Sequence, residues 1–209
     1  MSTAAEAPAS GGGARRATQA DAAALAQTMA RAFHDDPLMC HLLADVTARP
    51  QKMPRVFRLL FKLALPFGAC DVTPGYEAAA IWRPPGHADI PFWQYLTNAG
   101  ELLGVFGAGA LKVMQTMDIV EKVHPKAPHW YLQAVGTDPA RQGKGYGGLV
   151  IRHQLARVDA SGLPAYLESS KDTNIPIYQR LGFEVTGEIR IPNGPVLYPM
   201  WRKPYGSTG

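Results

Sequence analysis

A glycine-rich segment is the part of the sequence best suited to bind a phosphorylated ligand. It consists of Gln142, Gly143, Lys144, Gly145, Tyr146, Gly147 and Gly148. Glycine has no Cβ, so the backbone N–H groups of such a segment can turn inward without obstruction. If a helix starts here, its first N–H groups lack intrahelical partners and its dipole adds partial positive charge. The segment therefore predicts a cradle for a phosphate or pyrophosphate group.

Two other phosphate-binding motifs compete with this interpretation. Gly143, Gly145 and Gly148, with Glu168 about twenty residues later, formally match the dinucleotide fingerprint. That fingerprint should begin directly at the end of a strand, whereas residues 137–142 intervene here. The ATP-type P-loop requires Ser or Thr directly after its Gly-Lys pair, and Gly145 occupies that place. A tight turn alone would not need so many glycines.

The flanking sequence resembles one family. Residues 142–147 fit the Gln/Arg-x-x-Gly-x-Gly/Ala loop with which GNAT N-acetyltransferases hold the pyrophosphate of acetyl-CoA. Residues 130–139 resemble the family's strand before that loop, and residues 165–170 and 174–185 resemble its next strand and helix. The resemblance covers residues 128–203 and is nearest to the puromycin-type branch of small-molecule N-acetyltransferases.

The resemblance implies acetyl-CoA as the acetyl donor. No Cys/His cluster has metal-ligand spacing, so we expect no metal. The pyrophosphate would bind the glycine-rich segment, residues 142–148. Backbone groups of Val135, Gly136 and Thr137 would pair with the pantetheine amides, as an added strand does. Asn174 suits both a helix cap and a contact with the pantetheine arm.

Transfer from a thioester to an amine requires that the amine lose a proton, the oxyanion be stabilised and the thiolate be protonated. The resemblance implies direct attack in a ternary complex, with Tyr178 as the general acid or, alternatively, as a core aromatic. Many relatives carry Glu at the position of Gln133, which cannot accept a proton. Glu168 is the candidate base, although a salt bridge would also account for it. Asp36, His129 and a water relay remain open.

The elements that must position these residues can be outlined from periodicity and from helix-ending glycines. Leu25, Met29 and Phe33, for example, recur at helical spacing. Helices are predicted over 22–33, 52–65, 92–123, 148–160 and 174–181, and strands over 76–83, 129–138, 164–170 and 197–203, with a short first strand ending at 17–18. The resemblance implies an α/β (α+β) fold, with a mixed, mostly antiparallel twisted sheet flanked by helices and a splayed strand pair at the cofactor cleft.

The length predicts a single domain. The chain has 209 residues, enough for one well-buried core, and shows no repeat or linker. Residues 1–14 are rich in Ala, Ser and Gly and lack the apolar run of a signal peptide, so we expect a disordered leader there. Residues 15–205 form the expected N-acetyltransferase domain, with its cofactor-binding core at 129–185.

Composition argues against several other classes. The net charge is +4 and the Lys and Arg residues form no dense run, so we expect no nucleic-acid partner. Cys40 and Cys70 make no disulfide framework and fit reduced thiols in a cytoplasmic protein. The most apolar stretch, residues 102–111, is about half a membrane span, so we expect no membrane contact.

The predicted reaction transfers acetyl from acetyl-CoA to the primary amine of a small molecule, for which the puromycin-type resemblance suggests an antibiotic. The apolar residues of segment 92–123 favour core packing, with an apolar acceptor pocket as the alternative. A catalytically weak CoA-binding regulator, which Gln133 favours, and a protein or peptide N-acetyltransferase are the rival functions. Dimers are common in the GNAT family, so the resemblance allows a homodimer.

Overall fold

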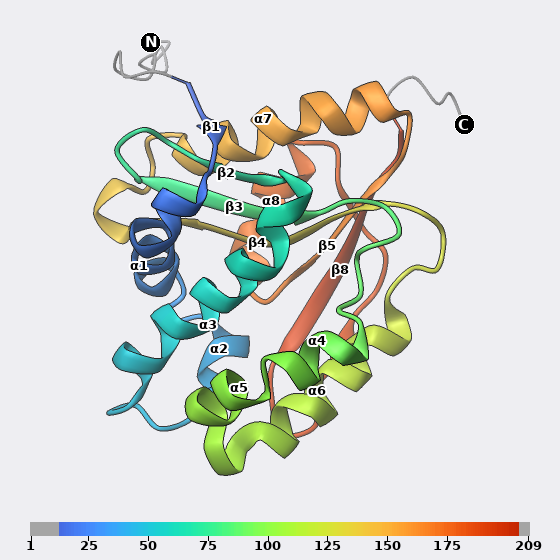
Figure 1. The fold of residues 1–209 in the computed structure, drawn as a ribbon. Coiled ribbons are helices and arrows are strands. Elements are labelled where there is room, and N and C mark those ends of the chain that lie inside the picture. Colours follow the sequence, from blue (N-terminus) through green and yellow to red (C-terminus); the bar gives the residue numbers. More distant parts are fainter. Residues whose placement is uncertain (1–12, 205–209) are drawn as a thin grey trace, which may run out of the picture.

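The computed structural model describes residues 13–204 (Figure 1). Of the predicted leader, residues 1–12 therefore lie outside the described residues, as does residue 205 at the other end of the predicted domain. Described residues form eight α-helices: α1 Ala22–Ala32, α2 Pro37–Leu42, α3 Arg49–Ala64, α4 Phe92–Thr97, α5 Ala99–Phe106, α6 Ala110–Val123, α7 Tyr146–Ser161 and α8 Ile175–Gln179. The strands are β1 Arg15–Arg16, β2 Cys70–Val72, β3 Ala78–Arg83, β4 Trp130–Thr137, β5 Ala165–Ser169, β6 Glu184–Val185, β7 Ile189–Arg190 and β8 Val196–Arg202.

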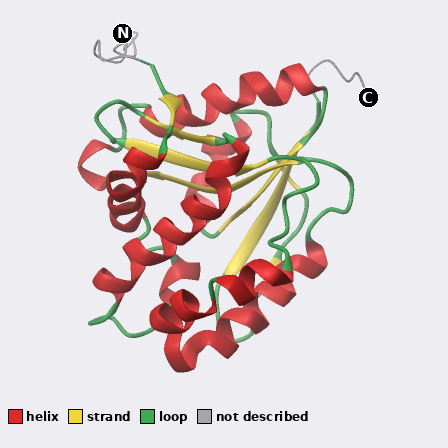
Figure 2. Ribbon diagram, viewed as in Figure 1, coloured by secondary structure: helices red, strands yellow, loops and turns green. Residues whose placement is uncertain are grey.

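The strands form one mixed sheet between two layers of helices (Figure 2). Its order is β1-β2-β3-β4-β5-β8-β6, with β7 paired to β8. Among the described strands β4 and β5 are the parallel pair, and the other pairs are antiparallel. The expected mixed, mostly antiparallel sheet is thereby confirmed.

Two apolar clusters hold the helices against opposite faces of the sheet. Leu25 and Met29 of α1 are fully buried with side chains of α3, whereas Val150 and Val158 of α7 are buried in the second cluster. All six residues of β3 are buried because helices cover both of its faces.

A bulge at Gln133 reverses the direction in which the following side chains of β4 point relative to the two helix layers. The register with β3 shifts between Ile81, which pairs with Ala134, and Trp82, which pairs with Leu132. Leu132 accordingly packs in the α7 cluster, whereas Ala134 packs in the α1 cluster. The extra residue bends the strand locally.

The parallel pair β4–β5 is joined only at its beginning. Trp130 pairs with Ala165 and Tyr131 with Tyr166, and no later pair follows although β4 continues to Thr137. The expected splay between two parallel strands is therefore present, directly after the last paired position and next to the bulge.

The predicted elements differ from the structure mainly where the segments are short. α2, β2, β6 and β7 were not predicted, since runs of two to six residues carry little periodicity. The first strand lies at Arg15–Arg16 instead of ending at 17–18. The predicted helix 92–123 is three helices, interrupted at Asn98 and again at Gly107, whose φ of 52° is incompatible with a continuing helix.

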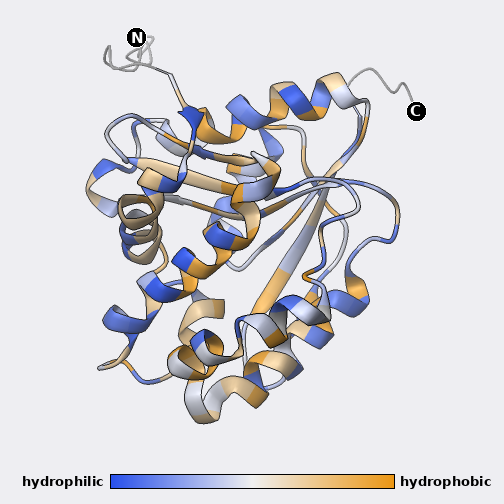
Figure 3. Cartoon of the chain, in the orientation of Figure 1, coloured by the Kyte–Doolittle hydropathy of each residue, from blue (hydrophilic) through white to orange (hydrophobic). Residues whose placement is uncertain are grey.

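The apolar residues of α4–α6 are only partly in the core. Val105 is buried and Phe106 packs against the α1 cluster, but Leu103 and Met114 are 60% and 66% exposed, so the core interpretation is wrong for them. Figure 3 shows apolar segments along these helices. The stretch Ala99–Val123 has a mean hydropathy of 1.2 over an 18-residue window that is 11% buried, which by length and composition alone would suit a membrane span. The expectation of no membrane contact therefore stays a prediction.

The close approach of α1 to β4 at Gly136 gives a test of the packing. A Cβ at Gly136 would lie 2.7 Å from Cβ of Ala32 and 3.1 Å from Sδ of Met29. We expect Gly136→Ala to lower the free energy of unfolding by about 1–3 kcal/mol, because overpacking forces helix and strand apart. Gly100→Ala in α5 is the control, since its Cβ would meet no atom within 4 Å and should stabilise by about 0.5–1 kcal/mol. Urea denaturation measures both, and a Gly136→Ala variant as stable as the parent would contradict this packing.

Candidate active site

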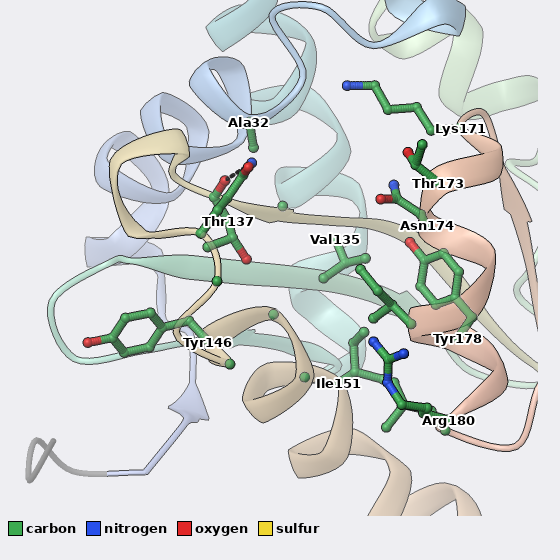
Figure 4. Close-up of a pocket in the computed structure, with 18 of the residues that line it drawn as sticks. Ala32, Val135, Thr137, Tyr146, Ile151, Lys171, Thr173, Asn174, Tyr178 and Arg180 are labelled. Carbon is green, nitrogen blue, oxygen red and sulfur yellow. Dashed lines mark hydrogen bonds between the residues drawn. The ribbon is translucent and has the colours of Figure 1, made fainter. Parts of the chain in front are cut away.

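One cleft of about 710 Å³ lies where β4 and β5 separate (Figure 4). It extends from the loop before α7, past β4, to α8. Most residues predicted to bind acetyl-CoA line it, together with Tyr178: Val135, Gly136, Thr137, Gln142, Gly143, Gly145, Tyr146, Gly147, Gly148 and Asn174. The two predicted site residues outside this lining are Lys144, which is exposed, and Glu168.

The glycine-rich loop leaves open space in front of the helix α7. Gly143 and Gly145 have φ values of 76° and 80°, and a Cβ added at either would meet no atom within 4 Å. Gly145 is the N-cap of α7, a helix of sixteen residues. Its first N–H groups therefore lack intrahelical partners and can bind an anion.

The loop is also held close to the end of β4. The Gln142 amide donates to the carbonyl of Thr137 at 3.3 Å. A Cβ at Gly147 would lie 2.9 Å from Oγ1 of Thr137, so this approach of loop and strand requires glycine.

Three cationic side chains that the sequence interpretation missed, Arg152, Lys171 and Arg180, line the same cleft. Positive charge on these side chains, added to the α7 N-terminus, favours a polyanionic ligand. A signal for Arg152 was present in the sequence, because it lies one helical turn after Gly148, and positions four apart share a helix face. Lys171 and Arg180 reach the cleft through tertiary structure and carry no comparable signal.

Tyr178 and Asn174 lie together on the α8 side of the cleft, across from Thr137, while Tyr146 points away from them (Figure 4). Tyr178 is 9% exposed, and its burial, reinforced by the negative charge of Asp36, raises the pKa of its hydroxyl well above 10. The hydroxyl is therefore protonated at neutral pH and available as a donor. Asn174 is the N-cap of α8 but makes no side-chain capping bond, so its amide is free for another partner.

Asp36 lines the cleft but both of its oxygens are engaged. Oδ1 accepts the N–H of Met39 at 2.9 Å and thereby caps α2, and Oδ2 accepts a hydrogen bond from Ser170. Burial raises the pKa of this carboxyl. Its position couples the start of α2 to the end of β5, beside Tyr178.

Glu168 lies outside the cleft lining, on the sheet face opposite α7. Its neighbours Ala165 and Leu167 pack in the α7 cluster, so the alternating Tyr166 and Glu168 point the other way. Oε1 of Glu168 is buried, 3.3 Å from Nδ1 of His124, and makes no hydrogen bond of good geometry. Oε1 of Gln133 in the bulge is likewise buried without a hydrogen-bond partner.

Known acetyltransferases share this sequence pattern and fold. Residues 60–183 match the model of the acetyltransferase (GNAT) family. An uncharacterised N-acetyltransferase of Schizosaccharomyces pombe is 26% identical over 190 residues, which make up 81% of this chain and 73% of that protein.

Solved structures agree with the family match. The crystal structure of histone acetyltransferase HPA2 and related acetyltransferase from Corynebacterium glutamicum is 27% identical, with a TM-score of 0.72 over 98% of this chain and 100% of that one. Drosophila melanogaster polyamine N-acetyltransferase shares the fold at 15% identity, with a TM-score of 0.62 over 91% of this chain and 98% of that one. The family match spans more than half of this chain and includes β4, the glycine-rich loop, β5 and α8. The chain therefore belongs to the GNAT acetyltransferase family and is an acetyl-transfer enzyme.

Proposed function

We propose that the chain transfers the acetyl group of acetyl-CoA to a primary amine of a small molecule by direct attack within a ternary complex. One observation carries the proposal: a single cleft joins an anion-binding helix N-terminus at one end to the buried phenol of Tyr178 at the other. Acetyl-CoA, the donor used by the GNAT family, has its pyrophosphate and its thioester separated by the pantetheine arm, which suits such a cleft.

The residues of the cleft fit each part of acetyl-CoA. The open space before Gly143 and Gly145, with Arg152 nearby, suits the pyrophosphate. Sheet pairing between β4 and β5 ends at Tyr131, so backbone groups of Val135–Thr137 that would face β5 are free to pair with the pantetheine amides. Asn174 has an uncommitted amide beside the same path.

Tyr178 is the proposed general acid. The amine attacks the thioester carbonyl, a C–N bond forms, the C–S bond breaks, and the departing sulfur takes the proton of the phenol. Because burial raises the pKa of Tyr178, the phenol stays neutral until negative charge forms on the sulfur. A backbone N–H of the splayed β4, for which we propose that of Val135, would polarise the thioester oxygen.

Glu168 is the proposed base among the three side chains considered. His129 uses both ring nitrogens, on Ala127 and on His124. Asp36 has both oxygens engaged, whereas Oε1 of Glu168 makes no hydrogen bond. This oxygen, which lies 3.3 Å from Nδ1 of His124 but accepts no hydrogen bond, supports Glu168, and it lies on the face opposite α7, from which an acceptor would approach acetyl-CoA bound across the splay.

Two observations support a small-molecule amine as the acceptor. Solved structures with this fold include enzymes named for polyamine, agmatine and arylalkylamine substrates. The partly exposed apolar helices α4–α6 would suit an acceptor with an apolar part. An antibiotic amine, as the puromycin-type resemblance suggests, belongs to this class.

Three further expectations from the sequence stay predictions: reaction without a metal, a cytoplasmic location and a homodimer.

The cradle at the start of α7 can be tested by ligand binding. Gly145→Asp should abolish the thermal stabilisation by acetyl-CoA, because the carboxylate would occupy and repel the pyrophosphate site. At about a hundred times its dissociation constant acetyl-CoA should stabilise the parent by roughly 2.7 kcal/mol. Gly162→Asp is the matched control, since Gly162 also has positive φ but caps the other end of α7. Equal stabilisation of both variants would place acetyl-CoA elsewhere.

The proposed acid can be tested by kinetics. Tyr178→Phe should lower kcat about a hundredfold or more, as expected for loss of a general acid, with little change in acetyl-CoA affinity. Because its pKa is raised, Tyr178 should cause no decline of kcat up to about pH 10. Tyr198→Phe, on β8 and outside the cleft, is the control. CoA release with a panel of amines gives the rates, and a Tyr178→Phe enzyme of normal kcat would exclude this role.

A further inference from the structure

The outer faces of α4, α5 and α6 carry exposed apolar side chains. Of the nine large apolar side chains that are exposed among the described residues, six lie on these helices and form the α4–α6 surface: Trp93, Leu96, Leu103, Leu111, Met114 and Val123. The three helices follow one another in the chain and pack together at the lower side of the molecule in Figure 1. Single exposed apolar residues are common on soluble proteins, whereas a concentration of them marks an interaction surface.

This part of the chain also carries few charges. Between residues 91 and 117 the sequence has two charged residues, Glu101 and Lys112. Both have partners within the protein, because Nζ of Lys112 donates to the carbonyl of His41 at 2.7 Å and Glu101 lies 4.0 Å from Nζ of Lys62 on α3. A helix that faces water ordinarily carries charged residues on its outer face. The composition of α4, α5 and the start of α6 therefore suits contact with an apolar phase.

A row of cations on α3 borders the α4–α6 surface. α3 holds five basic and no acidic residues, and its exposed residues after the first turn are Arg55, Arg58 and Lys62, which share one helix face. Nη1 of Arg55 donates to the carbonyl of Gly104 at 3.0 Å, and Nζ of Lys62 donates to Oδ1 of Asn98 at 2.8 Å. Both cations thus lie directly against the segment that joins α4 and α5, and these neutral partners leave them charged.

The cations and the apolar side chains reach solvent on the same side of α5. Gly100, Leu103 and Gly104 recur at helical spacing and are all exposed. A Cβ at Gly104 would lie 2.7 Å from Nη2 of Arg55, so the guanidinium lies on this face beside Leu103. Apolar side chains with cations at their border fit an anionic lipid surface, because the apolar groups can enter the lipid while the cations meet the phosphates.

We propose that the α4–α6 surface docks on a membrane that contains anionic phospholipids. Its apolar side chains, such as Leu103 and Met114, enter the boundary between headgroups and acyl chains, and the cations of α3 lie at the lipid phosphates. Trp93 suits the same boundary, because its ring is apolar and carries one polar N–H group. The inference goes beyond the proposed function, since it concerns where the enzyme lies and not what it transfers.

The geometry favours docking in the membrane plane over a span. The stretch Ala99–Val123 contains two separate helices, α5 of eight residues and α6 of fourteen, and each is shorter than the roughly 20 residues that a span requires. Their inner sides are held by the protein, since Val105 is buried in the α1 cluster and Ile119 packs against the apolar cluster of β7 and β8. The expectation of no membrane contact rests on the length of a span, which docking in the plane does not require.

Flotation of the full chain with lipid vesicles tests the inference. The parent should float with vesicles of phosphatidylcholine and phosphatidylglycerol, and less so as NaCl increases, because salt screens the cations. Arg58→Gln should weaken binding about fivefold, the equivalent of about 1 kcal/mol for one cation near an anionic surface. Lys203→Gln removes an exposed cation that follows β8 and should bind as the parent does. No binding of the parent to these vesicles at low salt would overturn the inference.

Tryptophan fluorescence tests which face meets the lipid. Trp93 is 60% exposed, whereas Trp82 and Trp130 are buried and Trp201 is half-buried. Vesicle binding should therefore shift the emission of the parent to shorter wavelength as Trp93 leaves water. Trp93→Phe should still float but lose this shift. Binding of the parent without the shift would place the lipid on another face and contradict the proposal.

A double variant separates the membrane from a second copy of the chain as the occupant. Leu103→Ser combined with Met114→Ser should weaken flotation about tenfold or more and change the free energy of unfolding little, because both side chains are mostly exposed. Val185→Ser, at an exposed apolar residue of β6, is the control. Sedimentation without lipid should give the same mass for the parent and the double variant. A parent dimer that the double variant dissociates would show that a second copy covers this surface, and the membrane proposal would fall.

Discussion

The separation of β4 from β5 is the constraint on which the rest of the site depends. Two parallel strands that begin as a pair stop exchanging hydrogen bonds after Tyr131 and Tyr166. A buried backbone cannot leave its N–H and C=O groups unpaired without a cost, so the opened edge of β4 calls for another partner. The bulge at Gln133 lies two residues after Tyr131, the last paired residue of β4, and redirects the strand. We propose that an extended pantetheine arm meets this requirement, which would make the opening a binding site.

The positively charged and the neutral groups along the opening follow one another in the order that the proposed reaction requires. The α7 N-terminus, Arg152 and Arg180 provide positive potential where phosphates would bind. Further along, buried Tyr178 remains a neutral donor, and on the opposite face of the sheet Oε1 of Glu168 lies 3.3 Å from Nδ1 of His124 without accepting a hydrogen bond. Because both of these side chains are largely buried from water, a small shift of a proton changes the electrostatic energy strongly. The proposed acid and the proposed base thus lie on different faces of the sheet.

The sequence was most informative where function depends on local backbone geometry. Gly143 and Gly145 adopt positive φ, which glycine can do without a steric penalty. The glycines in the sequence therefore allowed the loop and the start of α7 to be predicted closely. The places of Lys171 and of His124 beside Glu168 depend on tertiary packing and left no local pattern. The exposure of Leu103 and Met114 was also missed, because helical spacing of apolar residues does not reveal whether another element covers them.

Amide hydrogen exchange along β4, with and without acetyl-CoA, tests the central claim most directly. If the cofactor completes the opened edge of the sheet, the amides of Val135–Thr137 and of the first turn of α7 should become strongly protected in the complex. The β3 amides, already paired with β2 and β4, should change little. Unchanged exchange at residues 135–137 in a protein that demonstrably binds acetyl-CoA would contradict the account, because the cofactor would then lie outside the splay.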